Sequence, residues 1–289
     1  MADVPLDDVV ASSPAPLPSF PADTDSSVVE ERNKRLARES VARAEGLLMS
    51  RYGLGSPKEA FGLLRRASQQ FNIKLHTLAD VAVHLPPPDI GAARWVPPRP
   101  RVPAPPLPDL GTRRSRVVGQ SQVLKAAMHR VMQVTQTTMA NVQLAENGFL
   151  RLEQHFGLGP QFTEYFAFVE MGGKATSCSH AADQIRQITV HDIAVSDLFN
   201  DTARAVILGA GSRACHSVPL VGLHGAVMGV VSSHHASVIG EFDAEVLFAL
   251  QALGTQVGAW LSWYRNAVVL DALESIHAAV SAKGETDAE

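Results

Sequence analysis

The chain has 289 residues, of which 46% are hydrophobic and 19% charged, which is typical of about two globular domains and excludes a fibrous protein. Two cysteines, Cys178 and Cys215, are too few for a disulfide scaffold and fit a reducing compartment. The first residues lack the features of a signal peptide, and no apolar run approaches the ~20 residues that span a bilayer, so we expect a cytoplasmic protein with no membrane partner.

Charge is unevenly distributed along the chain, although the formal net charge is only −4. Residues 1–25 contain five acids and no base, residues 26–85 contain ten bases and six acids, and residues 86–117 contain six arginines and two aspartates. Acidic residues predominate in the remainder. A basic block between acidic flanks favours a polyanionic partner such as a nucleic acid.

The N-terminal part is predicted to consist of a tail and a small helical domain. Residues 1–25 are acidic and proline-rich, so we expect a disordered tail. Apolar residues at helical spacing predict a first helix at about 27–51 and a third from residue 75 to Pro86. Ser56 before Pro57, with Glu59 three residues on, predicts the start of the second helix. We therefore expect a three-helix domain at 26–85.

A many-residue motif within this domain resembles the ANTAR domain of bacterial transcription antiterminators, over residues 36–85. The resemblance implies a three-helix module that binds paired RNA hairpin loops and thereby suppresses a terminator. Glu45 stands where the family usually has lysine, which would remove a phosphate contact. The residues that carry the resemblance are Ala44, Gly46, Leu48, Met49, Ala60, Phe61, Leu64, Arg65, Ser68, Asn72, Lys74, Leu75 and Ala79.

Polar residues around the junction of the second and third helices are the candidates for RNA binding. Arginine and lysine neutralise phosphates, whereas serine and asparagine can hydrogen-bond base edges in splayed loops. The alternatives are a solvated helical face and, for Asn72, a helix cap. The first-rank candidates are Arg65, Ser68, Asn72 and Lys74; Arg51 and Arg66 are second, and Arg43 third.

A proline-rich segment follows the helical domain. Ten of the eighteen prolines lie between Pro86 and Pro108. Such a run favours extended polyproline II structure. We expect residues 86–117 to form a stiff, arginine-rich linker.

Residues 118–270 are predicted to form an α+β domain with an antiparallel sheet. Asn147-Gly148 and His224-Gly225 each separate two short apolar segments, which predicts two hairpins. Helices are predicted at 120–139, 160–168, 201–211 and from about 241, strands at 141–145, 149–153, 188–193, 218–222 and 227–232, and a glycine-rich loop at 171–179. The acidic end, 271–289, is predicted to be a tail.

This order of elements resembles a GAF sensor domain over about 118–265. The resemblance implies a pocket over the sheet for a small ligand, which the sequence does not identify, or a role in dimerisation. The matching residues are Val142-Gln143-Leu144, Gly148-Phe149-Leu150, Cys178, Ala181, Val190-His191-Asp192-Ile193, Ala210-Gly211, Arg213-Ala214, Ser217, Pro219-Leu220, Gly225, Gly229-Val230, Ser232 and His234.

Cysteine and histidine residues of this domain raise the question of redox or metal chemistry. Six histidines fall within 180–235, but no pair has a recognised metal-site spacing, so we expect no metal or haem. Some GAF-fold enzymes reduce free methionine sulfoxide with cysteines, which makes Cys178 and Cys215 an alternative redox pair. Two cysteines in a cytosolic domain are more often buried and pack as apolar residues.

An apolar stripe in the last predicted helix predicts a homodimer. Its residues recur at spacings of three and four, the period of a helix that packs along a partner. The alternative is that the stripe covers the domain's own sheet. The interface would comprise residues 241–270 with the helix at 120–139 beside it. The stripe contains Leu247, Leu250, Gly254, Val257, Leu261, Tyr264 and Val268.

These observations together predict a regulator and not an enzyme: a GAF-like domain that senses a signal or dimerises would control an ANTAR-like domain that binds RNA and antiterminates transcription. The first alternative is a DNA-binding regulator, because a basic three-helix unit can also enter a major groove. The second is the redox enzyme.

Overall fold

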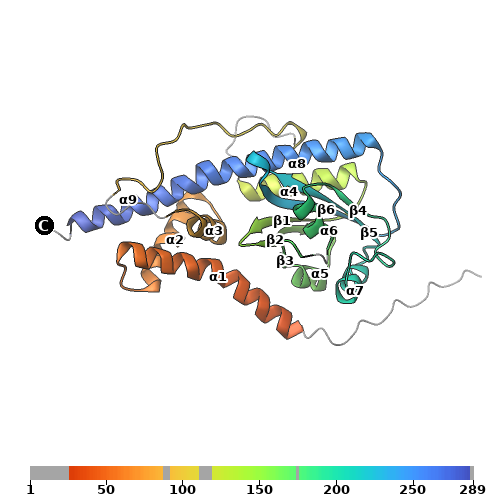
Figure 1. Cartoon of the computed structure of the whole chain (residues 1–289), viewed down its shortest axis with the longest axis horizontal. Coiled ribbons are helices and arrows are strands. Elements are labelled where there is room, and N and C mark those ends of the chain that lie inside the picture. The colour runs from red at the N-terminus through yellow and green to blue at the C-terminus, as the bar shows by residue number, and fades with distance from the viewer. Residues whose placement is uncertain (1–25, 87–91, 111–118, 174–175, 287–289) are drawn as a thin grey trace, which may run out of the picture.

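The computed structural model describes residues 26–86, 92–110, 119–173 and 176–286. A helical domain and a sheet domain lie side by side, and one long C-terminal helical segment runs along both (Figure 1). The predicted tail at 1–25 and parts of the linker lie outside the described residues.

Three helices form the N-terminal domain, as predicted: α1 (Ser26–Tyr52), α2 (Pro57–Phe71) and α3 (Leu75–His84). The Ser56 side chain caps α2 by accepting a hydrogen bond from the Glu59 backbone N–H at 3.4 Å. Asn72 ends α2 in the left-handed conformation, with φ of 51°. Leu48, Leu64 and Leu78 bring the three helices together in one fully buried core.

The second domain is built on a six-stranded antiparallel sheet in the order β3-β2-β1-β6-β5-β4. Both predicted hairpins are present. Asn147 and Gly148 both have positive φ, as a tight two-residue turn requires. The strands are β1 (Met139–Glu146), β2 (Phe149–Phe156), β3 (Phe168–Glu170), β4 (Ile188–Val190), β5 (Ala214–Val221) and β6 (Val227–His235).

Helices cover both faces of this sheet. The helices α4 (Gln120–Val134) and α8 (Ala244–Tyr264) share one buried core with Val218 and Val231 of the sheet. The other face is covered by α5 (Pro160–Tyr165), α6 (Ser177–Gln184) and α7 (Asp201–Gly209), which share a second core with Val230. Val230 and Val231 are neighbours in β6, so successive side chains of this strand point into opposite cores. The prediction of a loop at 171–179 is wrong from residue 177 on, because Thr176 caps α6.

The apolar stripe of α8 is covered within its own chain. A Cβ atom added to Gly254 would lie 2.6 Å from the Pro219 carbonyl oxygen, and one added to Gly258 would lie 2.2 Å from that of Val221. Both glycines therefore let α8 approach β5 closely. The alternative to a dimer, that the stripe covers the domain's own sheet, is therefore correct. The stripe no longer indicates a second chain.

The C-terminal segment is a helix and not the predicted acidic tail. After a π-helical turn at Arg265–Val269, α9 extends over Leu270–Thr286 and packs against α2 and α3. Ala272, Leu273 and Ile276 are buried in this contact. The prediction of a tail is therefore wrong for residues 271–286, because an apolar stripe at helical spacing runs through this acidic sequence.

The described part of the linker packs along α8 and α9. Trp95 is buried, and the backbone N–H groups of Trp95 and Val96 donate to the Glu274 carboxylate at 3.0 and 2.7 Å. Leu107 is also buried, just before a 3₁₀ turn at Pro108–Leu110. Residues 92–107 contain no helix or strand, and Arg99 and Val102 also hydrogen-bond α8 and the π-helical turn, so this described part is not a spacer that stands free of the C-terminal helices.

Candidate nucleic-acid interface and sensor pocket

Arg65 and Arg66 provide an outward-facing basic surface on α2. Both side chains are exposed, because Leu64 and Ala67 on the same helix point into the core. Gln69 continues this exposed surface. Two adjacent guanidinium groups on a helix can each contact a phosphate.

Ser68 and Asn72 serve the turn between α2 and α3. The Ser68 hydroxyl donates to the Ile73 carbonyl oxygen at 2.6 Å, so it stabilises the turn. The Asn72 side chain is exposed, while its backbone carbonyl accepts from the Tyr264 hydroxyl at 3.5 Å. Because Asn72 also ends α2 in the left-handed conformation, it is a helix cap, which was one of the two roles considered for it.

Lys74 and Arg51 contact other parts of the chain. Lys74, at the start of α3, forms an ion pair with Glu153 of β2. The Arg51 guanidinium lies over the rings of Tyr52 and Trp95, 5.6 and 5.4 Å from their centres. Third-ranked Arg43 pairs with Glu39 at 2.6 Å. The structure therefore leaves Arg65 and Arg66 outward, and it engages Ser68, Lys74 and Arg51 within the chain.

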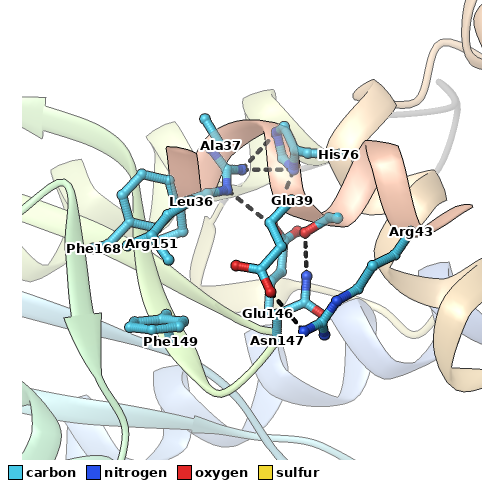
Figure 2. A pocket seen from close by; sticks show the side chains of 11 residues that line it. Leu36, Ala37, Glu39, Arg43, His76, Glu146, Asn147, Phe149, Arg151 and Phe168 are labelled. Carbon is cyan, nitrogen blue, oxygen red and sulfur yellow. Dashed lines mark hydrogen bonds and ion pairs between the residues drawn. The ribbon is translucent and has the colours of Figure 1, made fainter. Parts of the chain in front are cut away.

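A cavity of about 160 Å³ lies where α1 meets the β1–β2 hairpin (Figure 2). Leu36, Phe149 and Phe168 form its apolar wall, and Arg43 and Arg151 lie on its polar side. The Asn147 side chain bridges the two domains there by donating to the Ser40 hydroxyl.

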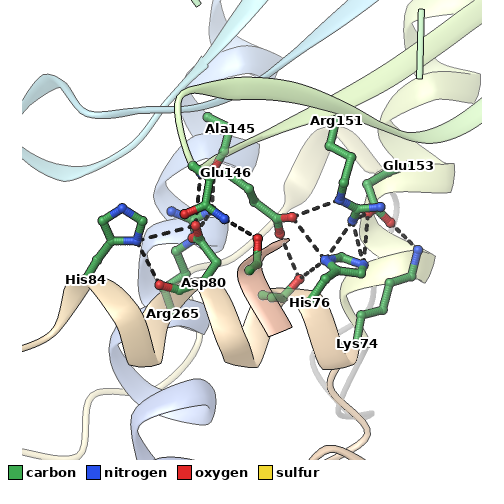
Figure 3. Close-up of polar contacts among 12 residues, drawn as sticks. Lys74, His76, Asp80, His84, Ala145, Glu146, Arg151, Glu153 and Arg265 are labelled. Carbon is green, nitrogen blue, oxygen red and sulfur yellow. Dashed lines mark hydrogen bonds and ion pairs between the residues drawn. The ribbon is translucent and has the colours of Figure 1, made fainter. Parts of the chain in front are cut away.

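A buried polar network joins α3 to the same hairpin (Figure 3). The Glu146 carboxylate accepts hydrogen bonds from the Thr77 hydroxyl at 2.9 Å and from Arg151 at 2.8 Å. His76 contacts it at 3.0 Å through Nδ1. A neutral His76 with its proton on Nδ1 donates to Glu146 and accepts at Nε2 from Arg151, which lies 2.5 Å away.

Burial acts on Glu146 and on His76 in this network. Burial alone would raise the pKa of Glu146, but the hydrogen bonds from His76 and Arg151 and the charge of Arg151 outweigh it and hold that pKa well below the usual range. Burial lowers the pKa of His76. The domains are therefore joined by an ionised carboxylate.

This network was not predicted from the sequence. Asp80 of α3 belongs to it as well: its carboxylate accepts from the Asn147 backbone N–H at 3.0 Å and lies 3.7 Å from Arg265. A usable signal was present, because Arg151 and Glu153 occupy one face of a strand whose intervening residue is Leu152. Charged residues at such positions indicate a second polar surface.

The sheet domain contains a small pocket in its second core. Its volume is about 20 Å³, close to that of one water molecule. The lining comprises uncharged residues: Asn141, Gln143, Phe162, Phe166, Thr176, Ser177, Cys178, Phe199, Ile207, Cys215, Ser232 and His234. A ligand larger than water requires these side chains to move.

Both cysteines line this pocket as buried thiols. Burial raises the pKa of Cys178 and raises that of Cys215 to about 12. A thiol must ionise to act as a nucleophile, so this environment disfavours redox catalysis. The pocket's His234 hydrogen-bonds Asn141 and Ser212, both at 3.0 Å. Among the described residues, no three potential ligands converge to hold a metal ion.

Two buried histidines make the stability of the sheet domain pH-dependent. Burial lowers the pKa of His216 to about 4 and that of His234 to about 3. Unfolding returns them to ~6.5, so their contribution is complete above pH ~6.5 and is lost as pH falls toward the folded values. At pH ~5 each should cost about 2 kcal/mol, at about 1.4 kcal/mol per unit.

Denaturant unfolding at pH 7.5 and 5 measures this loss. The His234→Gln variant should show a smaller loss than the parent, whereas a substitution of the exposed His155 by glutamine should not change it. Equal stability of the parent at both pH values would contradict the prediction.

The fold and site together define a two-domain protein in which a basic three-helix module is held against a sheet domain with a buried pocket. The ANTAR domain model matches residues 32–81, and the GAF domain model matches residues 121–261. The chain therefore carries an ANTAR domain followed by a GAF domain, and this architecture points to a regulator.

Solved structures give weaker likenesses. A GAF domain/HD domain protein from Geobacter sulfurreducens is 16% identical, with 52% of this chain and 97% of that chain covered and a TM-score of 0.44. A free methionine-R-sulfoxide reductase from Neisseria meningitidis is 15% identical, with 56% and 89% covered and a TM-score of 0.43. Scores this low carry no conclusion about this chain. No curated protein matches it significantly.

Proposed function

We propose that this protein is a cytoplasmic RNA-binding regulator of transcription antitermination, in which the ANTAR domain binds RNA hairpin loops and the GAF domain senses a signal. The observation that supports this most is the exposed pair Arg65 and Arg66 within the matched ANTAR domain. None of the helices in the described ranges has the length and apolar character needed to cross a membrane.

The chemistry of this surface suits a structured nucleic acid. Arginine contributes a planar, permanently charged donor group that pairs with phosphate oxygens. Asn72 lies at the next turn, where its exposed amide can contact a base edge. Lys74 can add a phosphate contact there only when its ion pair with Glu153 opens. The small pocket of the GAF domain is the candidate site for a small ligand, and dimerisation of this domain remains a prediction.

Binding by the full chain to two-hairpin RNA and to duplex DNA of equal length tests the proposal. The full chain is required, because α9 and Trp95 complete the helical core. We expect tighter binding to the RNA across a salt series, with log affinity falling linearly with log salt. Equal affinity for both nucleic acids at every salt concentration would contradict it and favour the DNA-binding alternative.

A further inference from the structure

One face of α3 carries hydrogen-bond donor groups, and carboxylates of the β1–β2 hairpin of the GAF domain bind them. Lys74, His76 and Thr77 all point toward β1–β2, where they meet the carboxylates of Glu146 and Glu153 (Figure 3). The two carboxylates are almost fully withdrawn from solvent, with side-chain exposures of 5% and 1%. The contact therefore forms part of the closed interface between the domains.

The donor set on this face is also suited to phosphate. A lysine ammonium, an imidazole N–H and a hydroxyl are typical donors to phosphate oxygens, and a carboxylate presents similar anionic acceptors. We propose that the face formed by Lys74, His76 and Thr77 is a second RNA-backbone contact, and that Glu146 and Glu153 occupy it in competition with RNA. This inference rests on the proposed function.

Geometry makes the two occupants mutually exclusive. Thr77 is completely buried while the hairpin is in place, so no phosphate can reach its hydroxyl. The hairpin turn is fixed on three sides, because Asn147 binds Ser40 and Asp80, and Arg265 donates to the Ala145 carbonyl oxygen at 2.5 Å. RNA can use this face only after the hairpin moves away.

The structure also connects this hairpin to the sensor pocket. Asn141 and Gln143 of β1 line the pocket, and Glu146 is the last residue of the same strand. The π-helical turn of the C-terminal segment begins at Arg265, which contacts both β1 and Asp80 of α3. A ligand that displaces pocket side chains would therefore act on the strand that carries the competing carboxylate.

Glu153→Gln in the full chain tests the competition, because it keeps the shape of the side chain and removes the charge that holds Lys74. We expect affinity for two-hairpin RNA to rise about tenfold, equivalent to about 1.4 kcal/mol. Backbone amide exchange in α3 should accelerate in the absence of RNA. Glu170→Gln removes the same charge from an exposed position of β3 and should change affinity less than about twofold.

A second variant, Glu146→Gln, acts on the neighbouring carboxylate and should shift RNA affinity and amide exchange in the same directions. Faster exchange in α3 with unchanged RNA affinity would show that this face does not bind RNA and would overturn the inference. Unchanged exchange and affinity in both variants would overturn it too. Absence of RNA binding by the parent and by every variant would instead refute the proposed function.

Discussion

A double variant, Arg65→Ala with Arg66→Ala, is expected to bind two-hairpin RNA about a hundredfold more weakly than the parent. Each substitution removes one guanidinium that can contact a phosphate, at a cost of about tenfold each. Loss of two contacts should also reduce the slope of log affinity against log salt by about 1.4 to 1.8. Filter binding or fluorescence anisotropy over a salt series measures both quantities.

The matched control removes the same charge from the GAF domain. Lys125 and Arg186 are exposed there, and their double alanine variant should bind RNA within about threefold of the parent, because long-range charge effects are screened. Both variants should remain folded, since all four side chains lie at the surface. Parent-like affinity and salt dependence in the Arg65/Arg66 variant would show that α2 does not contact RNA.

Gly258→Ala is expected to destabilise the GAF domain by more than about 3 kcal/mol. The added methyl group would lie 2.2 Å from the Val221 carbonyl oxygen and 2.4 Å from its nitrogen. These are backbone atoms of a strand hydrogen-bonded to β6, so α8 must move away from the sheet. Overpacking typically costs about 1–3 kcal/mol and occasionally more, and contact with fixed backbone atoms places this substitution at or above the upper end. At about 3 kcal/mol the midpoint of thermal unfolding should fall by about 6–12 °C.

Gly46→Ala is the control for the loss of glycine itself. Gly46 lies within α1, and an added Cβ would meet no atom within 4 Å. Alanine should therefore be neutral or stabilising by up to about 1 kcal/mol. Thermal unfolding followed by circular dichroism compares the two variants. A Gly258→Ala protein as stable as the parent would show that α8 does not lie this close to β5.

Local signals were sufficient for most of the secondary structure. Ser56-Pro57 predicted the start of α2, and Asn147-Gly148 predicted the turn between β1 and β2, because capping and turn geometry depend on a few consecutive residues. The ANTAR and GAF resemblances were confirmed at 32–81 and 121–261. Short-range periodicity could not decide what covers an apolar stripe: α8 packs on β5 of its own chain, although its pattern also fits a dimer.

The sequence by itself therefore determined the two domains, their order and the basic residues of α2. Only the tertiary structure decided that Lys74 pairs with Glu153, 79 residues away, and that Trp95 packs on α9 near Glu274, 179 residues away. The helical and turn signals operate within about four residues, because they arise from backbone geometry. Ion pairs and aromatic contacts between distant segments form only when the domains pack together. The spacing of residues along the chain therefore does not predict them.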